Sequence, residues 1–132
     1  MQIVKPIDIE DALRIDLAAL LGQSYTVCAQ PAPDDLSAGT VCVTCAGGAA
    51  QGVVANDYGI VIDCWGSTPA EAIELANLVH GYLFTLPIRV TSSAVYTTVN
   101  GNNPYLNPDP RRPILPRATF TANVGARGVS IL

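Results

Sequence analysis

Residues 58–87, YGIVIDCWGSTPAEAIELANLVHGYLFTLP, contain the two strongest structural signals in the chain. The first eight residues alternate between two faces, and one of these faces carries Tyr58, Ile60, Ile62 and Cys64. Strand residues alternate in this way, and a strand that is largely apolar on both faces is typical of the middle of a sheet. The pattern therefore predicts a central β-strand over residues 58–65.

A capped helix is predicted directly after this strand. Thr68 is placed to accept a hydrogen bond from the first turn, Pro69 takes the first helical position, and Glu71 completes a capping box. Pro87 is expected to end the helix, because proline cannot donate the backbone hydrogen bond that would continue it. A strand that runs into a capped helix is therefore the centre of the predicted fold.

The predicted helix carries two rows of residues. We expect the apolar row to face the core, and it consists of Ala72, Leu75, Ala76, Val79, Leu83 and Leu86. A second, half-apolar row consists of Ile73, Asn77, His80 and Phe84. We expect this second row to have a second neighbour. Gly81 costs about 1 kcal/mol relative to alanine inside a helix, and close approach of another backbone is one reason to keep it.

The flanking segments predict the remaining elements. A helix is expected over about residues 8–21, with Asp8 as its cap. Strands are expected at 24–30, at 40–46 with a break at 47–52, at 88–99 with a close at Asn100-Gly101, and at 118–127. A proline-rich loop at about 100–117 should be stiff and partly extended. The order predicts an α+β fold: one domain, residues 1–132, with a single mixed or antiparallel sheet and two helices packed against it.

Charge is scarce and unevenly distributed. Charged residues make up 14% of the chain and hydrophobic residues 49%, so some apolar surface is expected to face a partner. Residues 1–87 hold ten acids and two bases, a net −8, whereas residues 88–132 hold five arginines and one acid, a net +4, which together give −4. This division would let the basic end of one copy meet the acidic part of the next, as in a ring.

No membrane contact is expected from the sequence. The longest apolar stretches are far shorter than the ~20 residues that span a bilayer. The first residues, MQIVKPIDIE, lack the basic and apolar regions of a signal peptide. We therefore expect a cytosolic product.

The four cysteines invite a metal or redox interpretation. Cys42 and Cys45 form a CxxC motif, with Cys28 and Cys64 as further conceivable zinc ligands. However, residues three apart in a strand point to opposite faces, and no helix follows that would stabilise a thiolate. Buried cysteines in a reducing cytosol behave as small hydrophobes, so we expect no metal and no cofactor. A small Cys-dependent metal or redox module that also uses His80 is the alternative from a different class.

No credible active site emerges, so we expect a protein that is not an enzyme. His80 is the only histidine and has no nucleophile motif near it. Asp57 and Asp63 would lie about 20 Å apart along a strand, too far for an acid/base pair. Asp63, in an apolar strand, is expected to pair with an arginine. Arg111 and Arg112 could contact DNA phosphates, but the acidity of the chain favours intersubunit salt bridges or a lumen-facing position.

The order of these motifs resembles that of small tail terminator and tail-completion proteins of siphophages. The resemblance covers roughly residues 57–128, through GIVIDCWGSTPAEAIELANLVHGYL and NPDPRRPILPRATFTANVGARG. The positions that match are Asp63, Ala70-Glu71, Pro108-Asp109, Pro116-Arg117 and Arg127-Gly128. The chain departs from the pattern at Ala118-Thr119, where an aromatic residue is expected and Phe120 follows two positions later. The cysteines also lie outside the pattern.

The resemblance implies a ring-forming subunit, typically hexameric, that caps the finished tail tube and offers a docking surface for the head connector. The expected partners are other copies of the chain, the tail tube protein and the head connector, with possible non-specific contact to packaged DNA in the lumen. The expected location is the neck or tail of the virion, after assembly in the bacterial cytoplasm. The alternative within virion assembly is another neck protein, a head-closure or head–tail adaptor subunit. Candidate subunit-interface or lumen residues are Asp63, Ile73, Asn77, His80, Phe84, Arg111, Arg112, Arg117 and Arg127.

Overall fold

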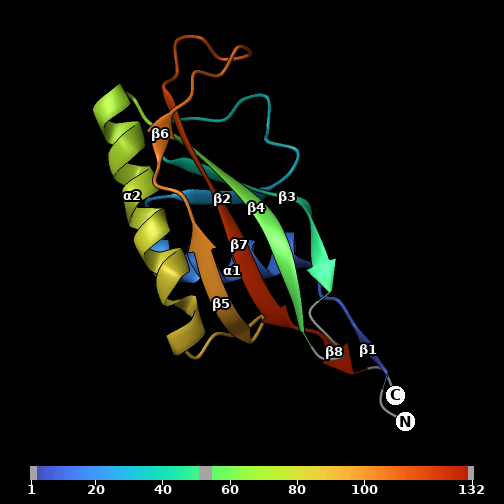
Figure 1. The fold of residues 1–132 in the computed structure, drawn as a ribbon. Helices are drawn as coiled ribbons and strands as arrows, with labels where there is room; N and C mark the ends of the chain where they lie inside the picture. The colour runs from blue at the N-terminus through green and yellow to red at the C-terminus, as the bar shows by residue number, and fades with distance from the viewer. Residues whose placement is uncertain (1–2, 51–54, 131–132) are drawn as a thin grey trace.

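A computed structural model describes residues 3–50 and 55–130, and shows a twisted β-sheet with helices on one face (Figure 1). The elements are, in chain order, β1 (Val4–Lys5), α1 (Ile9–Leu21), β2 (Thr26–Ala29), β3 (Thr40–Ala50), β4 (Ala55–Trp65), α2 (Pro69–Thr85), the 3₁₀-helix η1 (Leu86–Ile88), β5 (Tyr96–Gly101), β6 (Tyr105–Leu106), β7 (Arg117–Arg127) and β8 (Val129–Ser130). The main sheet has six strands in the order β2-β3-β4-β7-β5, and β6 also pairs with β7.

The sheet is mixed, because β2 and β3 run parallel and every other pair is antiparallel. The predicted α+β class, with two helices packed on a mixed sheet, is confirmed. A second, two-stranded sheet that the sequence did not predict joins β1 to β8 near the two ends of the chain (Figure 1).

The core lies between the helices and one face of the sheet. Ile60 and Ile62 of β4 and Phe120 of β7 point to this side and are almost completely buried. Leu13 and Leu17 of α1 belong to the same cluster. All six residues of the predicted core row of α2 also lie in this cluster and are buried. Each large side chain of this kind stabilises the fold by about 1.5–3 kcal/mol relative to an exposed position.

The predicted helix caps are present. The Asp8 carboxylate accepts a hydrogen bond from the Asp11 backbone N–H at 3.2 Å, and Thr68 Oγ1 accepts one from the Glu71 N–H at 3.1 Å. Glu71 Oε2 reaches back to the N–H of Ser67, at 3.1 Å, one residue before the cap. Both helices therefore begin where the sequence predicts, with their free first-turn amides partly satisfied.

The strand predicted at 40–46 was expected to break at residues 47–52. This prediction is wrong as far as Ala50, and residues 51 and 52 lie outside the described residues. Strand β3 continues to Ala50 through a register shift between Cys45 and Gly48. Gly48 has a φ of +157°, and a Cβ there would lie 2.1 Å from the carbonyl oxygen of Asp57. The glycines therefore permit a β-bulge in a continuing strand.

The predicted strand at 88–99 is also wrong in its bounds. Strand β5 begins at Tyr96 and includes Asn100-Gly101, which were predicted to close it. The residues before it form a loop, because the Ser92 hydroxyl and the Ser93 N–H both donate to the buried Asp16 carboxylate at 3.3 Å. This tertiary contact overrides the β-branched composition of the segment. The proline-rich loop contains the two-residue strand β6, which the sequence did not predict.

Replacing Thr68 with alanine tests the cap of α2. We expect Thr68→Ala to lower the free energy of unfolding by about 1 kcal/mol, because the Glu71 N–H loses its acceptor. Urea denaturation followed by circular dichroism measures this change. Ser24→Ala, at an exposed turn position outside the helices and strands, is the control and should change stability much less; equal losses in the two variants would contradict the assigned cap.

Candidate functional site

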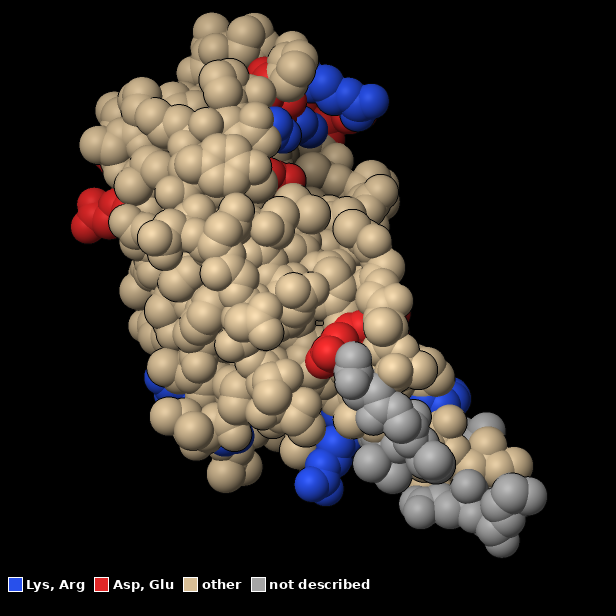
Figure 2. Space-filling model, viewed as in Figure 1, with Lys and Arg blue, Asp and Glu red and all other residues tan. Residues whose placement is uncertain are grey.

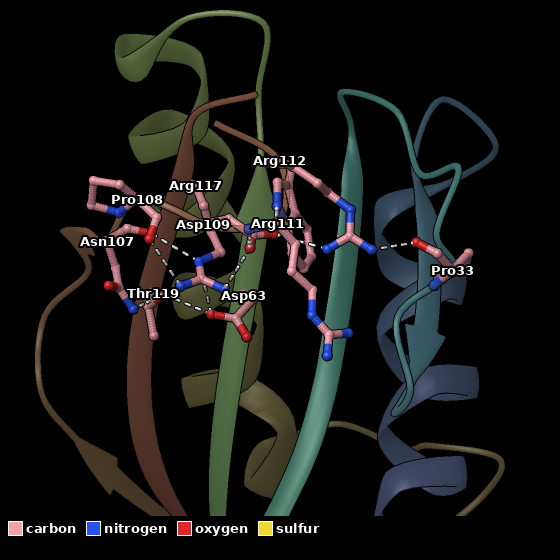
Figure 3. Close-up of polar contacts among 10 residues, drawn as sticks. Pro33, Asp63, Asn107, Pro108, Asp109, Arg111, Arg112, Arg117 and Thr119 are labelled. Carbon is pink, nitrogen blue, oxygen red and sulfur yellow. Dashed lines mark hydrogen bonds and ion pairs between the residues drawn. The ribbon is translucent and has the colours of Figure 1, made fainter. Parts of the chain in front are cut away.

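The proline-rich loop is anchored on the carboxylate of Asp109, whose residue is only 4% exposed. Its Oδ2 accepts hydrogen bonds from Trp65 Nε1 at 3.2 Å and from Arg112 Nη1 at 2.9 Å. Its Oδ1 accepts one from the backbone N–H of Arg111 at 3.0 Å. The nearest atom of Arg117, Nη1, lies 4.0 Å from Oδ1. Asp109 thus joins the loop to the end of β4 and to the start of β7 (Figure 3).

The contacts of Asp109 keep it ionised. Burial alone raises the pKa of its carboxyl group, but the hydrogen bonds from Arg112, the Arg111 amide and Trp65, together with the charge of Arg117, outweigh burial and hold the pKa below its ordinary value. A buried carboxylate with such partners is strongly coupled to them. Removing it would leave the Arg112 guanidinium without its ion-pair partner.

Asp63 and Arg117 form a second ion pair beside the first. Arg117 Nε lies 3.8 Å from Asp63 Oδ1, and the Thr119 hydroxyl donates to the same oxygen at 2.6 Å. Arg117 Nε also donates to the carbonyl of Asn107 at 2.8 Å, and Nη2 donates to that of Pro108 at 3.3 Å. The prediction that Asp63 pairs with an arginine is confirmed. Arg117 in turn holds the first residues of the loop against the sheet.

Arg112 connects the loop to the segment between β2 and β3. Its Nη2 donates to the carbonyl of Pro33 at 2.6 Å, and its guanidinium lies 5.7 Å from the centre of the Trp65 ring. Its Nε is buried and has no hydrogen-bond partner among the described residues. The loop is therefore held by residues from three separate parts of the chain.

An open hollow of about 380 Å³ lies between this network and the sheet. Its lining includes three arginines and two aspartates, which leaves one positive charge uncompensated. That charge belongs to Arg111, an exposed residue whose guanidinium has no hydrogen bond or ion pair within residues 3–50 and 55–130. Figure 3 shows its side chain lying over the sheet, apart from the paired groups.

The remaining candidate residues lie elsewhere. His80 stacks on Phe84 with ring centroids 4.3 Å apart and meets the edge of Phe120 at 5.2 Å. Ile73 and Phe84 pack against the core cluster, whereas Asn77 is exposed. The second row of α2 therefore has strand β7 as a neighbour within the chain. Arg127 is exposed at the far end of β7. The role of all these residues at an interface stays a prediction.

Several members of the network were not among the predicted site residues. Trp65 and Asp109 stand at the centre of the contacts, and Pro108-Asp109 had been noted only as part of the resemblance. A single acid within a proline- and arginine-rich stretch is the one local signal that could have marked Asp109. The contact with Trp65, 44 residues away, has no local signal.

The two cysteines that lie side by side are not the two of the CxxC motif. Cys42 and Cys45 face opposite sides of β3, as predicted, because their partners in β4 are Asp63 and Ile60. Cys42 instead lies beside Cys28, its register partner in β2. A hydrogen bond from Cys42 lowers the pKa of Cys28 to about 7, burial opposes this, and the charge of Arg112 adds to it.

The pKa of Cys42 is raised, first by the same hydrogen bond and then by burial. Burial and the nearby charge of Asp63 raise the pKa of Cys64. Among the residues that the structure describes, no group of three or more histidine, cysteine or acidic side chains is arranged to hold a metal ion.

Comparisons with known proteins give little further guidance. No family model matches the chain, and no curated protein matches it. One solved structure that is similar is a chain of the "Virion of native gene transfer agent (GTA) particle", with 18% identity and a TM-score of 0.49, covering 85% of this chain and 84% of that one. A similarity this weak establishes neither a family nor a function.

In the described part of the chain, no helix is long and apolar enough to cross a membrane.

Alkylation tests the hydrogen bond between the thiols of Cys28 and Cys42. We expect the rate of Cys28 labelling by iodoacetamide, followed by mass spectrometry, to rise with a midpoint near pH 7. Cys42→Ala should move this midpoint to higher pH, because the thiolate loses its hydrogen-bond donor. Cys45→Ala is the matched control and should leave it unchanged. A midpoint that is the same in the wild-type protein and both variants would exclude this hydrogen bond.

Asp109→Asn tests the anchor of the loop. We expect a loss of about 3 kcal/mol in the free energy of unfolding, because the buried part of Arg112 loses its counter-charge. Urea denaturation measures the loss, and Trp65 fluorescence reports on the local change. Asp35→Asn, at an exposed site, should have little effect.

Acidification tests whether Asp109 is ionised. Because the pKa of its carboxyl group is lowered in the folded protein, the stabilisation is complete above the unfolded-state pKa of about 3.9 and is lost as the pH falls through the folded-state pKa. The stability difference between the wild-type protein and Asp109→Asn should therefore be constant above about pH 5 and shrink below about pH 4. A difference that grows on acidification would contradict an ionised anchor.

Proposed function

We propose that this protein is a structural subunit of a phage virion, and specifically a tail terminator that forms a ring on the end of the tail tube. The observation that carries the proposal is one uncovered face of the sheet, which carries few charges and has the anchored basic loop at one end. In this proposal the neighbours are other copies of the chain, the tail tube protein and the head connector.

The uncovered face lies on the side of the sheet opposite the core. Register places Thr44, Gly59, Val61, Thr121 and Asn123 together on it, and we call these five residues the bare face. Figure 2 shows this side of the molecule, where charged side chains are few: most lie toward its margins, and one acidic group stands out on the lower part of the sheet. The register places Asp57 on the same side of β4 as Gly59 and Val61. The face of a sheet that meets water usually carries charged side chains. The small number of charges on the bare face suits a surface that another protein covers.

Isolated apolar side chains elsewhere also suit an assembled state. Ile114 in the proline-rich loop is 94% exposed and Ile88 is 87% exposed. Ile114 stands on a loop that is held through the contacts of Asp109 with Trp65 and Arg112, which lowers the conformational entropy that its burial against a partner would cost. Such residues are candidates for contacts with the tube or the connector.

A ring subunit needs no catalysis. It needs two different surfaces that fit each other, so that copies join head to tail and the chain of contacts closes. The uneven charge of the sequence supplies part of this complementarity. The resemblance of residues 57–128 to tail terminators supports the same function. The arginines near the loop would then lie at subunit contacts or along the lumen, where packaged DNA passes.

Electron microscopy of phage particles that lack the protein tests this proposal. We expect tails of uncontrolled length that are not joined to heads, and rescue by the wild-type chain supplied in trans. Asp35→Asn, which leaves the loop network intact, should rescue equally well. Heads that have lost their DNA beside tails of normal length would indicate a head-closure or adaptor protein instead. Normal virions would contradict any structural role.

A further inference from the structure

The outer side of α2 has a feature that the chain itself does not explain. Gly81 is exposed, and a Cβ added there would meet no atom within 4 Å among the described residues. Glycine is unfavourable in the middle of a helix, so a close contact within the chain would have justified it, and none is present. Gly81 shares an exposed strip with Glu74, Asn77 and Leu78, which we call the α2 ridge.

The α2 ridge is acidic and partly apolar. Leu78 is 38% exposed, α2 contains no lysine or arginine, and Glu74 has no hydrogen bond or ion pair in the described part of the chain. Glu71, the other acid of the helix, is occupied by the cap. The ridge therefore presents one free carboxylate, one apolar side chain and, at Gly81, a place where another backbone can approach closely.

The bare face has the complementary shape. Gly59, Thr121 and Asn123 line a shallow hollow of about 150 Å³ at its centre, so no long side chain stands in the way of a helix. Helix α2 has 17 residues and is about 26 Å long. Strands β4 and β7 have 11 residues each and extend about 36 Å, so the sheet is long enough to accept the helix. A helix on an uncovered sheet face is a common way to bury that face.

The free charges lie at the same end of the molecule. Helix α2 starts four residues after the end of β4, Trp65 pairs with Arg117 at that end, and Arg111 precedes Arg117 by six residues. Figure 1 shows the start of α2 and the proline-rich loop together at the top of the sheet. A rotation about an axis along the strands therefore keeps the start of α2 in one copy and the proline-rich loop of the next copy at the same end of the ring.

We propose that in the ring the α2 ridge of one copy packs on the bare face of the next copy, with the Glu74 carboxylate paired to the Arg111 guanidinium. Each copy then uses its ridge once and its bare face once, which is the head-to-tail arrangement that a closed ring requires. The contact neutralises the one positive charge that the loop network leaves free. This inference rests on the proposed function, since it requires that the chain assembles with itself.

The charge pair is tested by exchange in the full-length chain. Ring formation is measured by native mass spectrometry or, if the free chain is monomeric, by the number of copies bound per isolated tail tube. Arg111→Glu and Glu74→Arg should each lower assembly at least about tenfold, and the double variant should recover to within about threefold of the wild-type protein. The matched control joins Arg111→Glu to Asp35→Arg; it has the same net charge as the double variant and should not recover.

Gly81→Gln tests the close approach without changing charge. Glutamine favours a helix, so the melting temperature of the monomer should stay the same or rise, whereas assembly should fall at least about tenfold. Ala19→Gln makes a comparable change at an exposed position of α1 and should assemble normally.

The outcomes separate the two proposals. A wild-type chain that neither forms rings nor binds tail tubes would overturn the proposed function and this contact with it. If the wild-type chain assembles, the contact alone is overturned by a double variant no better than the single ones, by recovery in the control pair, or by normal assembly of Gly81→Gln. The bare face would then be covered by something else, such as the bare face of a second copy or a different virion protein.

Discussion

The pairing of β4 with β7 is the constraint on which the rest of the structure depends. Their eleven register pairs run without a bulge from Ala55 and Arg127 to Trp65 and Arg117. Because strand side chains alternate, this one register decides which residues enter the core and which lie on the bare face. A slip of β7 by one residue would move Phe120 out of the core and bring Thr119 or Thr121 into it. The same register places the last residue of β4 beside the first of β7, where the loop network forms.

The loop network shows how a segment with little regular structure can be held in one conformation. Five prolines restrict the backbone of the proline-rich loop but supply no backbone donors, so its position depends on side chains. Asp109 and Asp63 are mostly withdrawn from water, and each would be costly to bury without a partner. Arg112 and Arg117 meet that need and also donate to the carbonyls of Pro33 and Asn107, respectively. The same two guanidinium groups therefore neutralise the carboxylates and fasten the chain.

Local signals in the sequence predicted the local structure. The cap of α2 at Thr68, the buried row that includes Leu75 and Leu83, and the alternation of β4 each involve residues within a few positions of one another, and the structure has all of them. The class of fold followed from their order. What the sequence did not predict depends on distant partners: the bulge at Gly48 requires the carbonyl of Asp57, and the loop at Ser92 requires Asp16 from the first helix. Propensity and spacing carry no information about such contacts.

The site was predicted in part, for the same reason. Asp63 stands in an apolar strand, and its need for a counter-charge is a local inference that indicated an arginine without identifying it. Arg112 and the carbonyl of Pro33 are separated by 79 positions, so their contact could not be read from either segment. Cys28 and Cys42 are neighbours only because β2 and β3 run parallel, whereas spacing drew attention to Cys42 and Cys45.

The structure changes what the uneven charge of the sequence means. A net +4 over residues 88–132 implies a strongly basic end, but Arg112 and Arg117 are paired with Asp109 and Asp63 inside the chain. Arg89 is partly engaged, because it donates to Thr85 and lies over the ring of Tyr82. Arg111, in the loop before β7, and Arg127, at the far end of β7, remain available to a partner. A surface with so few free charges gains little attraction at long range, so its specificity must come from where those few charges stand on the face.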